Sequence, residues 1–440
     1  MDYQGALLYL QQVQAENHKL SLANVSRLIE TLPLTGKNKE KITFIQVGGT
    51  NGKGSTSSML AAVLTKAGYR AGLFTSPHLV CVRERIIVDG KQIGRGDFAR
   101  AVTMARSHAE TAVAAGRAES MPTFFETTLL AALMHFQERQ VQFAVLEVGL
   151  GGRLDATTAL PVDLALVTNV SRDHQHILGR RISDIAAEKG AIARPGVPML
   201  IGCRNSPRAG KVLAACAAQK GAPLYRAFPV GSRLRIEQNG SAYNCHYASG
   251  TKEFAFRLNL AGRHQAENAA LVIKAVEILR NYGWSISDQA LRRGLAELTM
   301  PARLETFPGP PPVIVDGAHN KASTEALASW LRERVNEPVS LVFGVLADKE
   351  YRAMSKILAP LARRVFLTEP PSPRRLPARL LKPWFTGLEV ILEPDPGRAL
   401  EQARSWPDMV VVCGSLYLAG LARELITRGG KNGRKQVQKG

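Results

Sequence analysis

The stretch that decides the fold of this chain is Val47-Gly48-Gly49-Thr50-Asn51-Gly52-Lys53-Gly54-Ser55-Thr56. Residues 41–47 are rich in β-branched and aromatic side chains and predict a strand, whereas residues 57–66 predict a helix. Glycines let backbone N–H groups converge on an anion, the helix start adds a partial positive charge, and Lys53 adds a full one. The stretch therefore predicts a loop that binds a nucleoside triphosphate, and a glycine turn without a ligand is the alternative.

One position departs from the usual form of such a loop. The usual motif has Ser or Thr directly after the lysine, and that hydroxyl binds the metal ion of the nucleotide. In this chain Gly54 follows Lys53. The metal ligands are therefore expected elsewhere in the sequence.

Length and composition predict a globular protein of two or three domains. The chain has 440 residues, of which 45% are hydrophobic. No stretch offers about 18 consecutive apolar residues and the first residues do not form a secretion signal, so neither membrane insertion nor secretion is expected. The cysteines lack zinc-site spacing, which predicts free thiols in a reducing cytoplasm. They are Cys81, Cys203, Cys216, Cys245 and Cys413.

The formal net charge of +20 predicts an attraction for anions but does not identify one. The basic residues are scattered, and no stripe of basic and aromatic residues points to nucleic acid. ATP or a polycarboxylate would be attracted as well as a polynucleotide. Part of the charge lies in residues 429–440, for which the composition predicts a disordered tail.

The order of predicted strands and helices indicates an α/β fold in two domains. Residues 1–300 hold the phosphate-binding loop and several buried strands that predict a mostly parallel sheet. Residues 224–256 within this part predict β-hairpins. After the proline-rich stretch 308–312, strands and helices alternate, which predicts a smaller α/β domain over residues 301–428.

Four side chains that suit a metal ion stand at or just after the ends of predicted strands: Ser76, His78, Glu147 and His174. The carboxyl ends of parallel strands line the ligand crevice of an open α/β sheet, and Mg²⁺ prefers hard oxygen ligands beside phosphates. These residues therefore predict a magnesium site. The alternatives are an ordinary Ser-Pro turn at Ser76 and an ion pair between Glu147 and Arg153.

The stretch Thr123-Phe124-Phe125-Glu126 opens a predicted helix. Thr123 as the N-cap and Glu126 three residues later form a capping box, and capping alone accounts for both. The two aromatic residues cannot both face one core, so one of them is expected against a planar ligand.

The order of motifs over nearly the whole chain resembles folylpolyglutamate synthase, a family that is often bifunctional with dihydrofolate synthase. These are ATP-dependent ligases related to the Mur ligases of cell-wall synthesis. The resemblance implies a phosphate-loop domain and a smaller Rossmann-like domain. The motifs that carry it are Gly49-Thr50-Asn51-Gly52-Lys53-Gly54-Ser55, Thr75-Ser76-Pro77-His78, Leu146-Glu147-Val148-Gly149-Leu150-Gly151-Gly152-Arg153-Leu154-Asp155-Ala156, Asp173-His174, Glu188-Lys189-Gly190, Asp316-Gly317-Ala318-His319-Asn320 and Gly414-Ser415-Leu416-Tyr417.

The resemblance also implies roles for individual residues. Lys189 matches a lysine that the family carbamylates, which turns an ammonium group into an anion able to meet a metal ion. The implied catalytic residues are Lys53, Glu147, His174, Lys189 and His319, and the implied metal ligands are Ser76, Glu147 and His174. Nucleotide contacts are implied for Thr50, Asn51, Gly52, Lys53, Gly54, Ser55, Asn268, Arg303 and Asp316. Contacts to the pterin-bearing substrate are implied for Thr123, Phe124, Phe125, Glu126, Leu154, Asp155 and Ala156.

The activity implied by the resemblance is an ATP-dependent addition of L-glutamate to dihydropteroate, to reduced folates or to both, through an acyl phosphate. ATP and Mg²⁺ are the implied cofactors, with Mn²⁺ and K⁺ as further cations. A cytoplasmic monomer is expected, without nucleic acid or membrane partners. The alternatives are a Mur-type amino-acid ligase, a phosphate-loop NTPase with a binding module, and a non-enzymatic binding protein.

Overall fold

The computed structural model describes residues 1–15, 22–32, 34, 40–202, 205–240 and 242–437. The chain forms two compact units. Unit 1 comprises Met1–Glu237, Asn244–Leu258 and Ala266–Leu298. Unit 2 comprises Gln238–Tyr243, Asn259–Gln265 and Thr299–Gly440.

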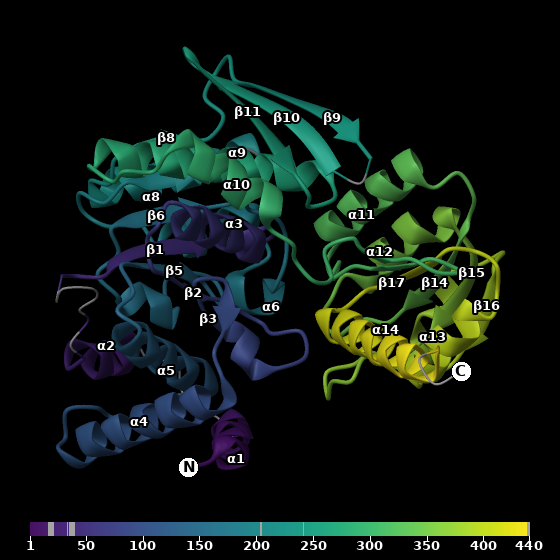
Figure 1. Ribbon diagram of the computed structural model, residues 1–440, viewed down its shortest axis with the longest axis horizontal. Coiled ribbons are helices and arrows are strands. Elements are labelled where there is room, and N and C mark those ends of the chain that lie inside the picture. The colour runs from purple at the N-terminus through teal and green to yellow at the C-terminus, as the bar shows by residue number, and fades with distance from the viewer. Residues whose placement is uncertain (16–21, 33, 35–39, 203–204, 241, 438–440) are drawn as a thin grey trace. The chain divides into compact units, whose positions relative to one another are not determined.

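Unit 1 is built on an eight-stranded sheet with the order β4-β3-β2-β5-β1-β6-β7-β8 (Figure 1). The six strands from β2 to β8 in this order are parallel, and the two strands at the other edge are antiparallel. Strands β5 and β6 are buried throughout and β1 is buried after its first residue, as the largely apolar composition of these central strands predicts. The strands are β1 Thr43–Gly48, β2 Ala71–Phe74, β3 Ile86–Val88, β4 Lys91–Gln92, β5 Phe143–Glu147, β6 Leu164–Val167, β7 Met199–Ile201 and β8 Leu224–Arg226.

Helices cover both faces of this sheet (Figure 1). Helices α1, α2, α4 and α5 pack together on one face, and α3 lies on the other face with α10 against it. The helices of unit 1 are α1 Tyr3–Ala15, α2 Leu22–Glu30, α3 Lys53–Lys66, α4 Arg95–Ala114, α5 Phe124–Glu138, α6 Gln175–Leu178, α7 Ile182–Gly190, α8 Pro207–Lys220, α9 Arg263–Asn281, which begins in unit 2, and α10 Asp288–Glu297. Two short 3₁₀ helices are η2 Val82–Arg85 and η3 Ala156–Ala159.

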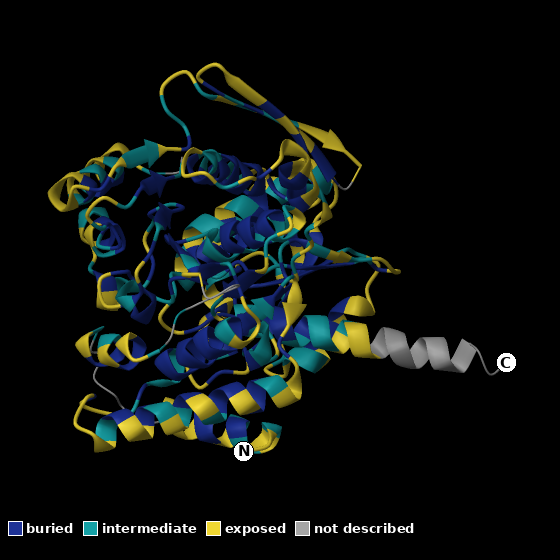
Figure 2. Ribbon diagram, turned by 60° about the vertical axis from the view of Figure 1, so that its left-hand side comes forward, coloured by how far each residue is buried: buried dark blue, intermediate teal, exposed yellow. Residues whose placement is uncertain are grey.

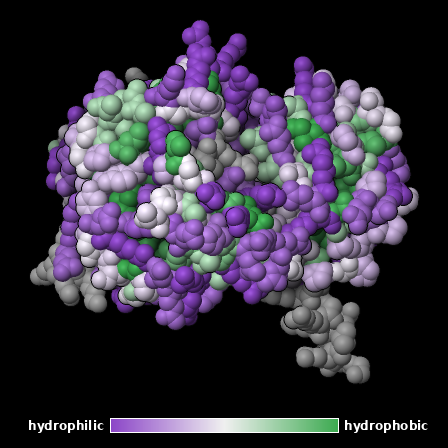
Figure 3. Space-filling view, turned by 90° about the horizontal axis from the view of Figure 1, so that it is seen from above, coloured by the Kyte–Doolittle hydropathy of each residue, from purple (hydrophilic) through white to green (hydrophobic). Residues whose placement is uncertain are grey.

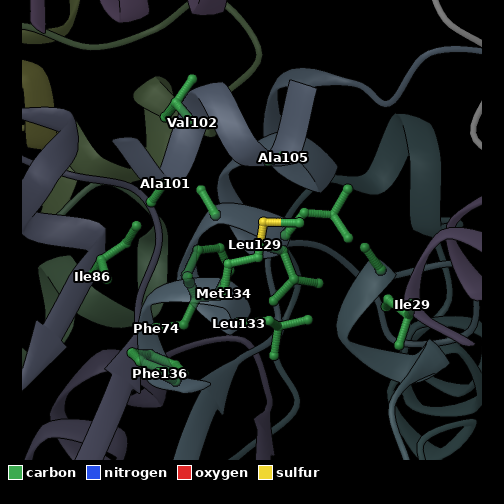
Figure 4. Close-up of a cluster of buried hydrophobic side chains, with 14 of the residues drawn as sticks. Ile29, Phe74, Ile86, Ala101, Val102, Ala105, Leu129, Leu133, Met134 and Phe136 are labelled. Atoms are coloured by element: carbon green, nitrogen blue, oxygen red, sulfur yellow. The ribbon is translucent and has the colours of Figure 1, made fainter. Parts of the chain in front are cut away.

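The largest core cluster of unit 1 lies between the sheet and the helices α1, α2, α4 and α5. Figure 4 shows side chains of α4 and α5 meeting Phe74 of β2 and Ile86 of β3. A fully buried Leu or Phe stabilises the fold by roughly 2 kcal/mol relative to exposure. In Figure 2 the central strands are buried, and the exposed residues of the helices lie on their outward faces.

The predicted β-hairpins were placed partly wrong. Strand β8 is not in a hairpin but is the last strand of the parallel sheet, paired with β7. With only three residues, Leu-Tyr-Arg, it cannot be told from a hairpin strand by alternation. The antiparallel part is a separate three-stranded sheet with the order β11-β10-β9, formed by β9 Arg233–Asn239, β10 Ala242–Ser249 and β11 Lys252–Leu258.

Unit 2 contains a six-stranded sheet with the order β12-β13-β17-β14-β15-β16. All neighbours in it are parallel except β12 and β13, as the alternation of strands and helices predicted. Its strands are β12 Glu305–Phe307, β13 Val313–Val315, β14 Val339–Phe343, β15 Ala362–Leu367, β16 Glu389–Leu392 and β17 Val410–Cys413. Its helices are α11 Lys321–Arg334, α12 Tyr351–Leu358, α13 Pro396–Arg404 and α14 Leu416–Val437, with 3₁₀ turns η4 Ala359–Leu361, η5 Ala378–Leu380 and η6 Lys382–Trp384.

Helix α14 extends to Val437 and so includes residues 429–437 of the predicted tail. Residues 438–440 lie outside the described residues.

The surface drawn in Figure 3 is largely hydrophilic. On the face shown in Figure 3, hydrophilic side chains are spread widely and hydrophobic ones form small separate patches. Among the helices of the described residues, none is both long and apolar enough to cross a membrane. Four cysteines are free thiols, as predicted, namely Cys81, Cys216, Cys245 and Cys413, and Cys203 lies outside the described residues.

Candidate functional site

The phosphate-binding loop connects β1 to α3, as predicted. Gly49 has a φ of +134°, and a Cβ atom there would lie 1.9 Å from the hydroxyl of Thr168. Glycine is therefore required at this position by the backbone conformation and by the close approach of β6.

Residues at the end of β6 hold this loop in place. The Thr50 amide donates to the Asn169 carbonyl at 2.8 Å, and the Asn51 amide donates to the Asn169 side chain at 3.0 Å. The Thr168 hydroxyl donates to the Asn51 carbonyl at 2.7 Å. Sequence reasoning missed both anchoring residues, although polar side chains at the end of a buried strand were the available signal.

The start of α3 has the features of an anion site. Its N-cap is Gly52, in the left-handed region at φ +82°, and glycine has no side chain with which to cap the helix. The Lys53 ammonium group donates to the Thr50 carbonyl at 3.2 Å and so lies over the loop. The side chain of Asn268 from α9 lies against Gly52, where an added Cβ would be 2.6 Å from Asn268 Oδ1. The structure thus brings together the nucleotide-binding residues predicted in unit 1.

Glu147, at the end of β5, lies beside the same loop and is buried, with 5% of its surface exposed. Its carboxylate accepts a hydrogen bond from the Ser76 amide at 3.0 Å. A Cβ atom on Gly54 would be 3.3 Å from Glu147 Oε2, so the glycine after the lysine leaves room for this carboxylate. Ser76 and Glu147 therefore adjoin each other, as the predicted metal site requires.

The alternative of an ion pair between Glu147 and Arg153 is wrong. Arg153 instead pairs with Glu188 at 2.9 Å. Glu147 is the last residue of the buried strand β5, whereas Glu188, the partner of Arg153, lies on α7.

His174 precedes α6 on the loop after β6, with a left-handed backbone at φ +49°. Its backbone amide donates to the neighbouring Asp173 carboxylate at 2.8 Å, and 32% of its side chain is exposed. The same loop is tied to the phosphate-binding loop, because the Ser171 amide donates to the Thr50 hydroxyl at 3.0 Å.

The predicted metal set fits a hard divalent cation in its chemistry, since it offers a hydroxyl, a carboxylate and an imidazole. Within the part of the chain that is described, no group of three or more His, Cys, Asp or Glu side chains is arranged to hold a metal ion. Two such side chains, Glu147 and His174, belong to the set, so other positions would fall to Ser76, phosphate oxygens and water. Mg²⁺ commonly binds in this way beside a nucleotide.

Lys189, near the end of α7, lies under the phosphate-binding loop. It is 4% exposed, and its ammonium group donates to the Gly49 carbonyl at 2.9 Å. Burial, reinforced by the nearby charge of Lys53, lowers the pKa of Lys189 to about 7. The helix thus carries an amine that is partly neutral near physiological pH.

A second glycine-rich loop, from Gly149 to Asp155, follows β5. Both oxygens of the buried Asp155 carboxylate are bonded within it: Oδ2 accepts from the Gly149 and Leu150 amides at 2.8 and 3.1 Å, and Oδ1 accepts from the Thr157 amide and hydroxyl at 3.0 and 2.5 Å. Burial raises the pKa of Asp155, and these hydrogen bonds oppose the shift. Of the other residues predicted to bind substrate here, Leu154 is exposed and Ala156 is buried.

The capping box at the start of α5 is confirmed. The Thr123 amide donates to Glu126 at 2.8 Å, and the Glu126 amide donates to the Thr123 hydroxyl at 3.3 Å. Both aromatic residues pack against the same core cluster, so the expectation that they cannot face one core is wrong. Phe125 packs against Phe74 and so closely against Gly149 that a Cβ atom there would be 2.8 Å from its ring.

Phe124 also faces a cation. The guanidinium group of Arg85 lies 5.0 Å from the centre of its ring, and Arg85 Nε donates to His78 Nδ1 at 2.9 Å. Burial and the charge of Arg85 lower the pKa of His78 to about 4, so His78 is neutral at pH 7. This cluster fastens the loop that carries Ser76, and it accounts for the position of His78 without a metal ion.

Three predicted residues belong to unit 2. Asp316 accepts hydrogen bonds from the Leu304 and Ala318 amides at 2.8 and 2.9 Å, and burial raises its pKa, opposed by the charge of Arg303. His319 Nδ1 lies 2.8 Å from the Gly317 carbonyl, which favours the tautomer with the proton on Nδ1. The three residues therefore gather where β13 ends.

Comparison with known families decides between the ligase and the other readings. Residues 47–276 match the Mur ligase middle domain, and residues 302–416 match the Mur ligase, glutamate ligase domain. The dihydrofolate synthase/folylpolyglutamate synthase of Bacillus subtilis is 33% identical over 414 residues, which cover 89% of this chain and 92% of that protein. This chain belongs to the folylpolyglutamate synthase and dihydrofolate synthase family. It is an ATP-dependent ligase that adds glutamate to folates, and the predicted fold class and activity are confirmed.

Other members of the folylpolyglutamate synthase family agree in sequence and structure. The folylpolyglutamate synthase of Lacticaseibacillus casei is 32% identical, covering 92% of this chain and 95% of that protein. The Mycobacterium tuberculosis folylpolyglutamate synthase complexed with ADP and AMPPCP superimposes with a TM-score of 0.87 at 30% identity, covering 96% of this chain and 99% of that one.

Two further solved structures of the folylpolyglutamate synthase family hold ligands. Escherichia coli FolC in complex with DHPP and ADP has a TM-score of 0.84 at 28% identity, covering 97% of this chain and 98% of that one. The bifunctional enzyme of Yersinia pestis complexed with AMPPNP and a Mn ion has a TM-score of 0.83 at 28% identity, with the same coverage.

Proposed function

We propose that this ligase accepts both dihydropteroate and reduced folates and joins L-glutamate to each through an acyl phosphate. The observation that carries the proposal is the phosphate-binding loop, in which Lys53 and the uncapped start of α3 lie beside Glu147 and Ser76. The double name of the Bacillus subtilis relative supports two acceptors. ATP and a divalent metal ion, which relatives hold as ATP analogues and Mn, are the cofactors of the reaction.

The chemistry requires activation of a carboxylate. Attack of an amine on a carboxylate would have to expel oxide, so the γ-phosphoryl group of ATP is first transferred to the acceptor carboxylate, leaving ADP. The glutamate amine then attacks the carbonyl carbon of the acyl phosphate, the C–O bond to phosphate breaks, and the amine loses a proton. Positioning and neutralisation of charge are the main tasks of the protein, and no nucleophilic side chain is needed.

Residues of unit 1 supply those tasks. Lys53 and the backbone amides at the start of α3 bind the β- and γ-phosphates, and Asn268 lines the loop beside Gly52. Ser76, Glu147 and His174 are the residues that would hold a divalent metal ion, which supplies charge neutralisation at the phosphates. The contacts of Arg303, Asp316 and His319 with nucleotide rest on the resemblance and stay predictions.

Lys189 is proposed to carry a carbamate. A neutral amine attacks CO₂ to give the carbamate anion and one proton, and a pKa of about 7 leaves much of the buried amine neutral at physiological pH. The charge would then change from positive to negative under a loop that binds phosphates and metal. A carbamate signal from ¹³C-labelled bicarbonate that Lys189→Met lacks would support this role, and its absence from the wild type would reject it.

One experiment tests the proposed function. The enzyme is incubated with ATP, Mg²⁺, glutamate and either dihydropteroate or a reduced folate, and products are weighed by mass spectrometry. Addition of one glutamate to dihydropteroate and of one or more to the folate is expected, with one ADP for each bond. Product with a UDP-linked peptide substrate instead would show a Mur-type ligase, and hydrolysis stimulated only by a polynucleotide would show an NTPase of another kind.

Two further properties remain predictions. A monomer is expected, and light scattering of the purified protein would measure its mass. Cytoplasmic residence is also expected, and fractionation of the producing cells would test it.

A further inference from the structure

A buried polar network lies behind the loop from Gly149 to Asp155, and none of the roles above uses it. Its centre is Gln46, a fully buried glutamine in β1, on the strand that leads into the phosphate-binding loop. An amide in an apolar strand is costly unless its donor and acceptor groups are bonded. In this chain the bonds of the Gln46 side chain lead to the glycine loop after β5 and to the end of α7.

The acceptor side of Gln46 binds Arg194, just beyond α7. Arg194 Nη1 donates to Gln46 Oε1 at 2.9 Å and to the Ile192 carbonyl at 2.8 Å, and Nη2 donates to the Thr158 carbonyl at 2.8 Å. Burial lowers the pKa of Arg194 to about 10, which still leaves it charged at pH 7. A partly buried cation thus joins the end of α7 to β1 and to η3.

The donor side of Gln46 binds two hydroxyl groups. Nε2 donates to Thr157 Oγ1 at 2.8 Å and to Thr158 Oγ1 at 2.9 Å. Each hydroxyl then donates its own proton onward, Thr157 to Asp155 Oδ1 at 2.5 Å and Thr158 to the Gly152 carbonyl at 2.7 Å. These hydrogen bonds therefore run in one direction, from the guanidinium cation to the Asp155 carboxylate and the glycine loop.

The loop itself packs against α7, the helix of Lys189. A Cβ atom on Gly152 would lie 2.6 Å from the Glu188 carbonyl, and the Arg153 amide donates to that carbonyl at 3.2 Å. The network consequently connects three elements of the site: β1 before the phosphate-binding loop, the loop after β5, and α7.

We propose that Gln46 and Arg194 are positioning residues that hold the loop from Gly149 to Thr158 in the shape that binds the pterin-bearing acceptor. They act through the directed hydrogen bonds to Asp155 and Gly152, and they touch neither substrate nor metal. The inference rests on the proposed function only in naming the acceptor as the ligand of this loop. Loss of this network is expected to weaken acceptor binding and to leave ATP binding unchanged. The phosphate-binding loop is anchored separately, by Asn169 and Thr168.

The decisive variant is Gln46→Glu, in which shape and size are kept. The new carboxylate still accepts the hydrogen bond from Arg194 and forms an ion pair with it, so the fold is retained. It cannot donate a hydrogen bond to the hydroxyl groups of Thr157 and Thr158. Each threonine then has one proton for two acceptors, so Asp155 and the Gly152 carbonyl compete with the new carboxylate for it. We expect the KM for dihydropteroate or reduced folate to rise about tenfold, with the KM for ATP and the affinity for AMPPNP within about twofold of wild type.

Threonine variants test the direction of the bonds. Thr158→Ser keeps the hydroxyl and is expected to give a KM close to wild type, whereas Thr158→Val removes it and raises the acceptor KM severalfold. Ser340→Ala is the control, because it likewise removes a hydroxyl that donates a hydrogen bond, here to the Asp408 carboxylate in the sheet of unit 2. It is expected to lower the melting temperature without changing the acceptor KM.

Hydrogen exchange of the full chain gives a readout that needs no activity. In Gln46→Glu the amides of Gly149, Leu150 and Thr157 are expected to exchange about fivefold faster, while amides of α3 exchange as in wild type. An unchanged acceptor KM in both Gln46→Glu and a folded Gln46→Met, or a loss of AMPPNP affinity equal to the loss of acceptor affinity, would overturn the proposal. If the wild type ligates glutamate to no pterin, the proposed function fails, and the exchange rates alone decide: faster loop exchange supports positioning, and unchanged exchange rejects it.

Discussion

The two glycine-rich loops of unit 1 follow neighbouring parallel strands but use their backbone groups in opposite ways. The loop after β1 leads into α3 through Gly52, which offers no capping side chain. The loop after β5 leads into η3 through Asp155, whose carboxylate accepts from Thr157 and from the Gly149 and Leu150 amides. One loop is therefore prepared for an anion from outside, and the other already contains its own anion.

The difference shows that glycine content alone does not make a phosphate site. An anion-binding loop needs a helix start without an internal cap and a cation that can reach it, here Lys53. In a loop that closes on a buried carboxylate, the backbone amides already donate to that carboxylate and are not available to a ligand. Such a loop contributes to ligand binding through its shape. Substitutions that remove one feature of either loop at a time test this difference, and their expected effects range from a loss of ligation to a small loss of stability.

Lys53→Ala and Glu147→Ala should each abolish ligation, with kcat/KM lower by about a thousandfold or more, because both charges act where phosphoryl transfer develops charge. Product formation measured by mass spectrometry checks this. Lys220→Ala, at the exposed end of α8, is the control and should ligate normally. Full activity in either site variant would refute the site assignment.

Gly54→Ser should lower kcat by about a hundredfold without unfolding the protein. The new side chain meets Glu147 Oε2, which a Cβ atom alone would approach to 3.3 Å, and offers it a hydroxyl that pulls the carboxylate out of place. Steady-state rates and a thermal melt measure the two effects. Gly96→Ala, where a Cβ atom has no neighbour within 4 Å, is the matched control and should match wild type.

Lys189→Met should change the pH dependence of stability in buffers free of CO₂. The folded pKa of about 7 lies below the ordinary 10.5, so in wild type stability rises as pH increases between these values, while below pH 7 the cost of the buried ammonium is fully present. Relative to wild type the variant should be more stable by on the order of 3 kcal/mol at pH 6, and this gain should shrink toward pH 10. Urea denaturation across this range measures the difference, and a gain that grows with pH would contradict it.

Asp155→Asn should raise the acceptor KM about tenfold and destabilise the fold by about 2 kcal/mol, while the affinity for ATP stays unchanged. An asparagine has one oxygen acceptor, so the amide pair on Oδ2 or the Thr157 pair on Oδ1 loses its partner. Separate titrations of acceptor and ATP measure the split. An equal loss for both substrates would show that the two loops are not independent.

Thr123→Ala should cost about 1 kcal/mol, as the loss of an N-cap usually does. The substitution removes the hydroxyl that accepts from the Glu126 amide. The N-cap residue of α5 then has no capping side chain, as in α3. Thermal denaturation measures the change. Thr123→Ser keeps the cap and should have a stability close to that of wild type. If Thr123→Ala weakens acceptor binding by more free energy than it removes from folding, Thr123 contacts the substrate directly.

The local features of the site could be predicted from the sequence. Strand, glycine loop and helix are contiguous between residues 41 and 66, and the capping box at Thr123 needs only four residues. The pairing of Glu147 could not be predicted, because Arg153 is the nearer cation in the sequence but forms its ion pair with Glu188 on α7. Strand β8 was misplaced for a related reason, since a strand of three residues does not reveal which sheet it joins.

By itself the sequence determined the backbone conformations, the alternation of strands and helices, and the kinds of chemistry available, because glycine, β-branched residues and charged groups act within a few residues of one another. The tertiary structure alone decided which loops meet. The order β5-β1-β6 puts Glu147 on one side of the phosphate-binding loop and Asn169 on the other, and the register pairs Val47 with Glu147. It also sets the Gln46 side chain between Arg194 and Thr157, which lie 148 and 111 residues away in sequence. A single buried amide thus links the strand before the phosphate-binding loop to the loop that is predicted to bind the acceptor.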